Sequence, residues 1–169
     1  MQRPPDITLR RTRMDDVPLL HAFELDEAAN AMAGTKPRDW GAFSARWAAI
    51  LGEGECGCAN GATGTGVTPR VIVLAGKVVG AINIVHEDGA ASIGYWIART
   101  HWGRGIASRA VGLMLEECRI RPLLATASAG NTASLRVLEK HGFVAIRRER
   151  TAETARTVER ETVTLRLEA

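Results

Sequence analysis

Apolar and polar residues in the middle of the chain are arranged in a way that predicts a strand followed by a helix. A short apolar run, Tyr95-Trp96-Ile97, leads through a polar link into the turn Gly103-Arg104-Gly105. After the turn, apolar residues recur with the period of a helix that is buried along one side. The positions of this repeat are Ile106, Ala110, Val111, Met114, Leu115 and Cys118. Residues 94–117 are therefore predicted to form a strand, a glycine turn and an amphipathic helix.

Helical patterns also occur on either side of this segment. Asp15 is expected to cap a first helix. Residues 26–36 are small and polar and predict a loop or an irregular helix, and the glycine-rich residues 52–66 predict a flexible loop. A last helix is predicted from Asn131 to His141, with Gly142 after its end. Asp39 is expected to cap another helix, whose apolar face carries Trp40, Phe43, Trp47, Ile50 and Leu51.

Strand patterns complete the fold prediction. The order is a strand, two helices, three strands, a helix, a strand, a helix and two strands, which is typical of the α+β class. We expect one domain over residues 1–169, with a mixed, mostly antiparallel sheet of about six to seven strands flanked by about four helices. Residues 90–127 should contribute a parallel strand pair through a right-handed crossover. The predicted strands are residues 7–11, 70–74, 78–86, 90–97, 123–127, 143–148 and 157–167.

Composition excludes several classes of function. The net charge of +3 is small and dispersed, which argues against a nucleic-acid partner. No segment approaches the roughly 20 apolar residues that span a bilayer, and no signal peptide is apparent, so we expect a cytoplasmic protein with no membrane partner. Cys56, Cys58 and Cys118 are too few for a four-ligand metal set, and their odd number argues against a disulfide framework. We therefore expect no metal.

The glycine turn predicts a binding site for an anion. Glycines at the start of a helix leave backbone N–H groups unobstructed, and these groups together with the helix dipole attract phosphate. A dinucleotide is one candidate ligand, but a dinucleotide site needs an acidic residue about 20 positions further on. The strand at residues 123–127 contains no acid. Residues 52–57 also spell a dinucleotide motif, but they do not lie between a strand and a helix.

Three motifs together resemble the GNAT N-acetyltransferase superfamily. The superfamily signature Gln/Arg-x-x-Gly-x-Gly/Ala aligns its last two fixed positions with Gly105 and Ala107, and its first position falls on Trp102. A tryptophan at this position, combined with the sequences of segments 131–134 and 139–143, resembles the pattern of the RimJ/RimL-like branch of the superfamily. The resemblance implies a GNAT-like fold, acetyl-CoA as co-substrate, and a primary amine acceptor that is a protein N-terminus or a small molecule. It is compatible with a monomer or a homodimer.

The resemblance also implies which residues bind coenzyme A. Asn131 is expected to contact the coenzyme and to cap its own helix. Backbone groups of Ile97, Ala98 and Arg99 would pair with the pantetheine arm, and the Ile97 amide would stabilise the thioester oxyanion. The pyrophosphate would lie on backbone N–H groups after Trp102, from Gly103, Arg104, Gly105, Ile106, Ala107 and Ser108. The Arg104 side chain either contacts a phosphate or is an ordinary surface residue.

The catalytic residues are less clearly marked. Many relatives use a tyrosine as general acid at the position of Leu138, so the resemblance points to Ser134, which could protonate the leaving thiolate. Ser92 stands where many relatives carry a glutamate that serves as base. Because this chain lacks both the tyrosine and the glutamate of those relatives, a non-catalytic acyl-CoA-binding protein remains an alternative. Other candidate bases are Glu24, Asp26, His86, Glu87 and Asp88.

Overall fold

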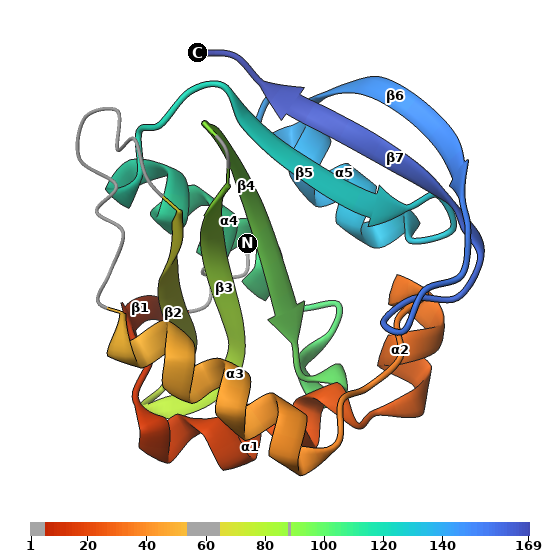
Figure 1. Ribbon diagram of the computed structural model, residues 1–169. Coiled ribbons are helices and arrows are strands. Elements are labelled where there is room, and N and C mark those ends of the chain that lie inside the picture. The colour runs from red at the N-terminus through yellow and green to blue at the C-terminus, as the bar shows by residue number, and fades with distance from the viewer. Residues whose placement is uncertain (1–5, 54–64, 88) are drawn as a thin grey trace.

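The computed structural model describes residues 6–53, 65–87 and 89–169 (Figure 1). Within these residues a single seven-stranded sheet runs in the order β1-β2-β3-β4-β5-β7-β6. Neighbouring strands are antiparallel, except for the parallel pair β4 and β5. The strands are β1 (Ile7–Arg11), β2 (Gly66–Leu74), β3 (Lys77–Glu87), β4 (Ala90–Ile97), β5 (Leu123–Ser128), β6 (Val144–Thr151) and β7 (Arg160–Leu167).

The parallel pair divides the sheet into two parts. β4 and β5 are paired at a single register position, Ser92 with Leu124. Beyond this point the two strands diverge, as Figure 1 shows. The backbone of β4 after Ser92 has no ladder partner on the β5 side among the described residues. The end of β4 is therefore the place where the sheet opens.

In the described part of the chain five α-helices cover the sheet, one more than the sequence predicted. They are α1 (Val17–Glu24), α2 (Glu27–Ala33), α3 (Trp40–Gly52), α4 (Ile106–Glu117) and α5 (Thr132–Lys140). α1 and α3 cover one face of the β1–β4 part and α4 covers the other, while α5 lies against the β5–β7 part (Figure 1). The predicted fold class, an α+β protein with a mixed and mostly antiparallel sheet, is confirmed.

The additional helix, α2, occupies the segment predicted as a loop or an irregular helix. The Asp26 carboxylate accepts a hydrogen bond from the Ala29 backbone at 2.9 Å and caps the helix start. Gly34 closes the helix with a φ of +69°. A helix of seven residues carries too short a pattern to be recognised by its period, so its two caps were the usable signal.

The start of α1 also differs from the prediction. A 3₁₀ turn at Met14–Asp16 precedes the helix, so Asp16 rather than Asp15 occupies the cap position. The Asp16 carboxylate accepts two hydrogen bonds from the Arg10 guanidinium, at 2.7 and 2.8 Å, and one from the Arg13 backbone at 2.8 Å. This bidentate pair fastens the first helix to β1.

Apolar side chains form a separate core on each face of the sheet. The larger core joins α4 and α5 to strands of both parts through residues such as Ile82, Met114, Leu138 and Leu165. The smaller core packs Phe43 and Trp47 of α3 against Val71 and Ala81. None of the described helices is long and apolar enough to cross a membrane.

Candidate active site

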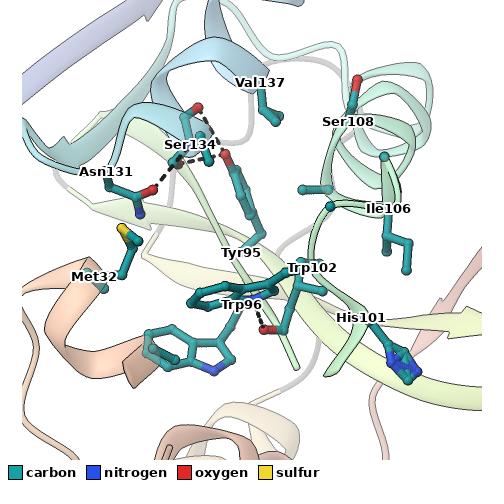
Figure 2. Close-up of a pocket in the computed structure, with 17 residues that line it drawn as sticks. Met32, Tyr95, Trp96, His101, Trp102, Ile106, Ser108, Asn131, Ser134 and Val137 are labelled. Atoms are coloured by element: carbon teal, nitrogen blue, oxygen red, sulfur yellow. Dashed lines mark hydrogen bonds between the residues drawn. The ribbon is translucent and has the colours of Figure 1, made fainter. Parts of the chain in front are cut away.

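A cavity of about 300 Å³ lies where the sheet opens, between α2, the end of β4 and the first turns of α4 and α5 (Figure 2). Its wall combines backbone of the glycine turn with side chains from elements far apart in the sequence. Nine of the residues that the resemblance pointed to line it: Ile97, Trp102, Gly103, Gly105, Ile106, Ala107, Ser108, Asn131 and Ser134.

The glycine turn forms part of the wall of this cavity. Gly103 and Gly105 have φ angles of +73° and +72°, a conformation that a residue with a side chain adopts only under strain. Gly105 is the N-cap of α4 and offers no side-chain cap, and the first helical hydrogen bond runs from the Arg109 amide to the Gly105 carbonyl at 3.1 Å. Amides of residues 106–108 therefore have no partner within the helix and can receive a phosphate.

The end of β4 presents backbone groups toward the open side of the sheet. The Ala98 amide donates to the Val79 carbonyl at 2.9 Å, so the N–H of Ala98 is used within the sheet. Ile97 precedes it and lies opposite Gly80. In an antiparallel ladder, hydrogen-bonded pairs alternate with unbonded ones, so the Ile97 N–H and C=O point away from β3. The Ile97 carbonyl accepts the indole N–H of Trp102 at 2.9 Å, which ties the turn to the strand.

Ser134 is joined by a tyrosine that the sequence reasoning did not select. The Tyr95 hydroxyl lies 2.7 Å from Ser134 Oγ and 3.3 Å from the Ser134 carbonyl (Figure 2), and its single proton can be directed to either oxygen. Burial raises the pKa of Tyr95, and the hydrogen bond to Ser134 opposes this more weakly. The phenol is consequently a proton donor at neutral pH. Strand alternation could have drawn attention to it, because Tyr95 lies on the same side of β4 as Ile97.

Asn131 serves as the N-cap of α5 and also lines the cavity. Its side-chain oxygen accepts a hydrogen bond from the Ser134 backbone at 3.2 Å. At the other end of this helix, His141 Nε2 lies 2.8 Å from the Ser108 carbonyl and 3.2 Å from the Ser108 hydroxyl. The histidine joins the end of α5 to the first turn of α4, and residues at the start of each helix, Ser108 and Asn131, line the same cavity.

Three of the predicted coenzyme contacts do not line the cavity. Ala98 is buried, and Arg99 and Arg104 are exposed. Arg99 pairs with Asp26 at 2.8 Å, and this hydrogen bond is the largest cause of the lowered pKa of Asp26. Arg104 belongs to the turn itself, and its position on the surface is compatible with either of the roles considered for it.

The candidate bases are scattered. Glu24 lines a second cavity and is paired with Arg156 at 2.8 Å. Asp26 is engaged by Arg99 and by the α2 cap. His86 is buried on β3, burial lowers its pKa, and it lines neither of these cavities. Glu87 is exposed, and Asp88 lies outside the described residues.

Metal binding finds no support in the part of the chain that the structure describes. No group of three or more His, Cys, Asp or Glu side chains there could hold an ion. Cys56 and Cys58, together with most of the predicted 52–66 loop, lie outside the described residues.

Comparisons with known proteins fit this geometry. Residues 6–144 match the family described as acetyltransferase (GNAT) domain. No curated protein matches the sequence significantly.

Solved structures share the fold at low sequence identity. RimJ of Mycobacterium smegmatis, in complex with CoA-disulfide, is 24% identical with a TM-score of 0.72, and the match covers 96% of this chain and 82% of RimJ. Spermidine N-acetyltransferase of Vibrio cholerae, in complex with CoA and spermine, is 13% identical with a TM-score of 0.77, covering 96% and 95%. A Salmonella typhimurium acetyltransferase that modifies the N-terminal serine of ribosomal protein L7/L12 is 18% identical with a TM-score of 0.73, covering 96% and 95%.

Proposed function

The chain belongs to the GNAT acetyltransferase family, with acetyl-CoA as its co-substrate, and from this premise we propose that it acetylates a primary amine by direct attack within a ternary complex. One observation carries the proposal. The glycine turn, the exposed backbone of Ile97 and the Ser134 hydroxyl all line one cavity. Acetyl-CoA brings a phosphate group, a carbonyl that gains negative charge and a leaving thiolate, and each of these three features finds a matching group there.

The first turn of α4 is proposed to hold the pyrophosphate. Amides of Ile106, Ala107 and Ser108 lack partners within the helix, and the helix dipole adds to their attraction for an anion. A Cβ added at Gly103 or Gly105 would meet no atom within 4 Å, so the space beside the turn is open to a ligand. These residues therefore fit the group that the family requires.

The Ile97 amide is proposed to stabilise the oxyanion. Its direction away from β3, into the gap between β4 and β5, supports this role, because a backbone donor held by a sheet needs no reorganisation during the reaction. Trp102 holds the strand end and the turn in a fixed relation through its hydrogen bond to the Ile97 carbonyl.

Ser134 is proposed as the general acid, with Tyr95 as its positioning partner. When Tyr95 donates to Ser134 Oγ, the serine proton is free to point into the cavity toward the leaving sulfur. The hydroxyl of a serine is a weak acid by itself, and a buried phenol that donates to it strengthens it as a donor.

The acceptor must be a neutral amine when it attacks, although free amines have pKa values of about 8 to 10. Among the candidate bases, Glu24 lines the second cavity but is committed to arginine pairs. We therefore propose that a water chain removes the proton. The relatives named above act on a protein N-terminus or on spermidine, so both acceptor classes belong in a test.

Release of the CoA thiol in the presence of an amine panel tests the proposal. Ser134→Ala should lower kcat about tenfold or more while affinity for acetyl-CoA stays within about twofold. Ser44→Ala on α3, away from the cavity, is the matched control and should behave as wild type. Unchanged kcat would remove Ser134 from the mechanism. Tight acetyl-CoA binding without thiol release from any amine would contradict acetyl transfer and indicate a CoA-binding protein.

A further inference from the structure

A second cavity of about 270 Å³ lies on the face of the sheet that α1 and α3 cover. Trp96 of β4 lines both cavities, so the two spaces meet at this residue, next to Ile97. The Trp96 indole donates to the Phe23 carbonyl at 3.1 Å, which fixes the shared wall. An acceptor held in the second cavity would therefore lie next to the end of β4.

Positive charge dominates the polar part of this cavity. Arg38, Arg46 and Arg156 line it, and the only carboxylate among its described lining residues belongs to Glu24. The remaining wall is largely aromatic and aliphatic, with Phe43 and Trp47 of α3. A guanidinium beside an apolar wall attracts carboxylates strongly, because little water competes for its donors.

Two arginines lie against the Glu24 carboxylate. Its Oε1 accepts from Arg156 at 2.8 Å and from the Arg38 backbone at 3.0 Å, with the Arg38 guanidinium at 3.6 Å. The negative charge of this carboxylate is therefore offset by two guanidinium groups, which weakens its attraction for a cationic ligand. Arg46, in contrast, is exposed and makes no hydrogen bond or ion pair with the residues that the structure describes.

The arginines repel one another. The pKa of Arg38 is lowered, first by burial and then by the positive charges of Arg156 and Arg46, and Glu24 opposes these effects only in part. One carboxylate thus leaves the three guanidinium groups undercompensated. A second anion in the cavity would relieve this repulsion.

In addition to the arginine donors, β3 contributes a hydrogen-bond acceptor to this cavity. Asn83 also lines the cavity, and its buried side-chain oxygen has no hydrogen-bond partner within the described part of the chain. Asn83 pairs across the ladder with Gly94 of β4, close to Trp96. An N–H donor on a ligand would satisfy this oxygen.

We propose that this cavity binds the acceptor and selects a primary amine that carries a carboxylate, with the carboxylate at the arginines and the amine toward Asn83 and Trp96. The preference rests on the acetyl transfer proposed above. A polyamine would bring two or more positive charges to a cavity whose wall already carries three guanidinium groups and one carboxylate, so it is disfavoured. The volume suits a free amino acid or the first residues of an acidic peptide.

Thiol release from acetyl-CoA measures the preference with matched acceptors. L-alanine and L-alaninamide form a free pair, and amidated peptides that begin Ala-Glu and Ala-Gln form an N-terminal pair, with spermidine as the cationic probe. In at least one pair, the member with the additional carboxylate should have a kcat/KM about tenfold higher. The pair that shows this difference identifies the source of the carboxylate.

Arg46→Gln should reduce the ratio of kcat/KM for the acidic acceptor to kcat/KM for the neutral acceptor about fivefold to tenfold. Arg46→Glu should reverse the preference, so that the neutral acceptor has the higher kcat/KM. Arg119→Gln, an exposed arginine that lines neither cavity, is the control and should keep the wild-type ratio. Acetylation of amines regardless of charge, or preference for spermidine, would overturn the carboxylate preference and leave acetyl transfer intact. Thiol release from no amine would instead contradict acetyl transfer itself.

Discussion

At the scale of single residues, the contact between Tyr95 and Ser134 carries the most chemistry. The two hydroxyls are 2.7 Å apart, a well-formed O–H···O hydrogen bond. Burial holds the pKa of Tyr95 above its ordinary value, so the phenol keeps its proton at and above neutral pH. Tyr95 can then act only as the donor whenever the serine proton is directed into the cavity.

Replacing Tyr95 by phenylalanine should therefore slow catalysis without affecting coenzyme binding. The ring is retained and one hydrogen bond is lost, which is worth about 1 kcal/mol and corresponds to a kcat about fivefold to tenfold lower. KM for acetyl-CoA should stay within about twofold. Steady-state kinetics of Tyr95→Phe, with the melting temperature as a check on folding, make the measurement.

The double variant Tyr95→Phe/Ser134→Ala separates a positioning role from an independent one. If Tyr95 acts through Ser134, the double variant should be no slower than Ser134→Ala alone. If the fold-decrease in kcat of the double variant equals the product of the two single fold-decreases, Tyr95 contributes independently of Ser134.

At the scale of elements, the sequence predicts most of what the local pattern determines. The helical period after Gly105, the Asp39 cap of α3 and the glycine after α5 all led to elements that the structure contains. The Tyr95 and Ser134 contact could not be predicted in this way, because it joins a strand to a helix 39 positions away. The arginine cluster of the second cavity is likewise assembled from separate elements.

The turn before α4 can be tested by its backbone conformation. Gly105 has a φ of +72°, so Gly105→Ala should cost about 1–2 kcal/mol of stability and weaken acetyl-CoA binding as the helix start shifts. Urea unfolding and calorimetric titration with CoA measure the two effects. Gly94→Ala, at a glycine without positive φ and with no atom within 4 Å of an added Cβ, is the control. Equal effects of the two substitutions would contradict the special role of the turn.

The connection between β1 and α1 makes stability depend on pH. Hydrogen bonding by Arg10 is the largest cause of the lowered pKa of Asp16, while burial acts in the opposite direction. A pKa that is lower in the folded state adds stability above the unfolded value of about 3.9, and this stability is lost as the pH falls through the folded value. Asp16→Asn should thus cost about 1–3 kcal/mol at pH 7 and progressively less below about pH 4.

Urea unfolding of wild type and Asp16→Asn at several pH values measures this difference. Asp15→Asn, at the exposed neighbouring carboxylate, should change stability by less than about 0.5 kcal/mol. A cost for Asp16→Asn that stays constant from pH 7 to pH 3 would mean that the Arg10 pair contributes nothing through charge.

At the scale of the whole molecule, the cavity proposed for coenzyme A spans the two parts of the sheet. Ile97 and the α4 turn belong to the part with β1–β4, whereas Asn131 and Ser134 belong to the part with β5–β7. The only ladder position that β4 and β5 share within the described chain is Ser92 with Leu124. The β7 side also holds α2 in place, because Arg160 donates to the Gly34 carbonyl at 2.9 Å.

Coenzyme binding should consequently slow hydrogen exchange in both parts of the sheet. CoA at about a hundredfold excess over its Kd adds about 2.7 kcal/mol of stability, and amides that exchange by local opening should gain protection where the ligand makes contact. We expect this protection at residues 106–108, at Ile97 and in the first turn of α5. Exchange measured by mass spectrometry with and without CoA, on wild type and Gly105→Ala, makes the comparison. Protection confined to α4 would show that CoA contacts only the glycine turn, whereas protection that includes α5 requires a ligand bridging the two parts.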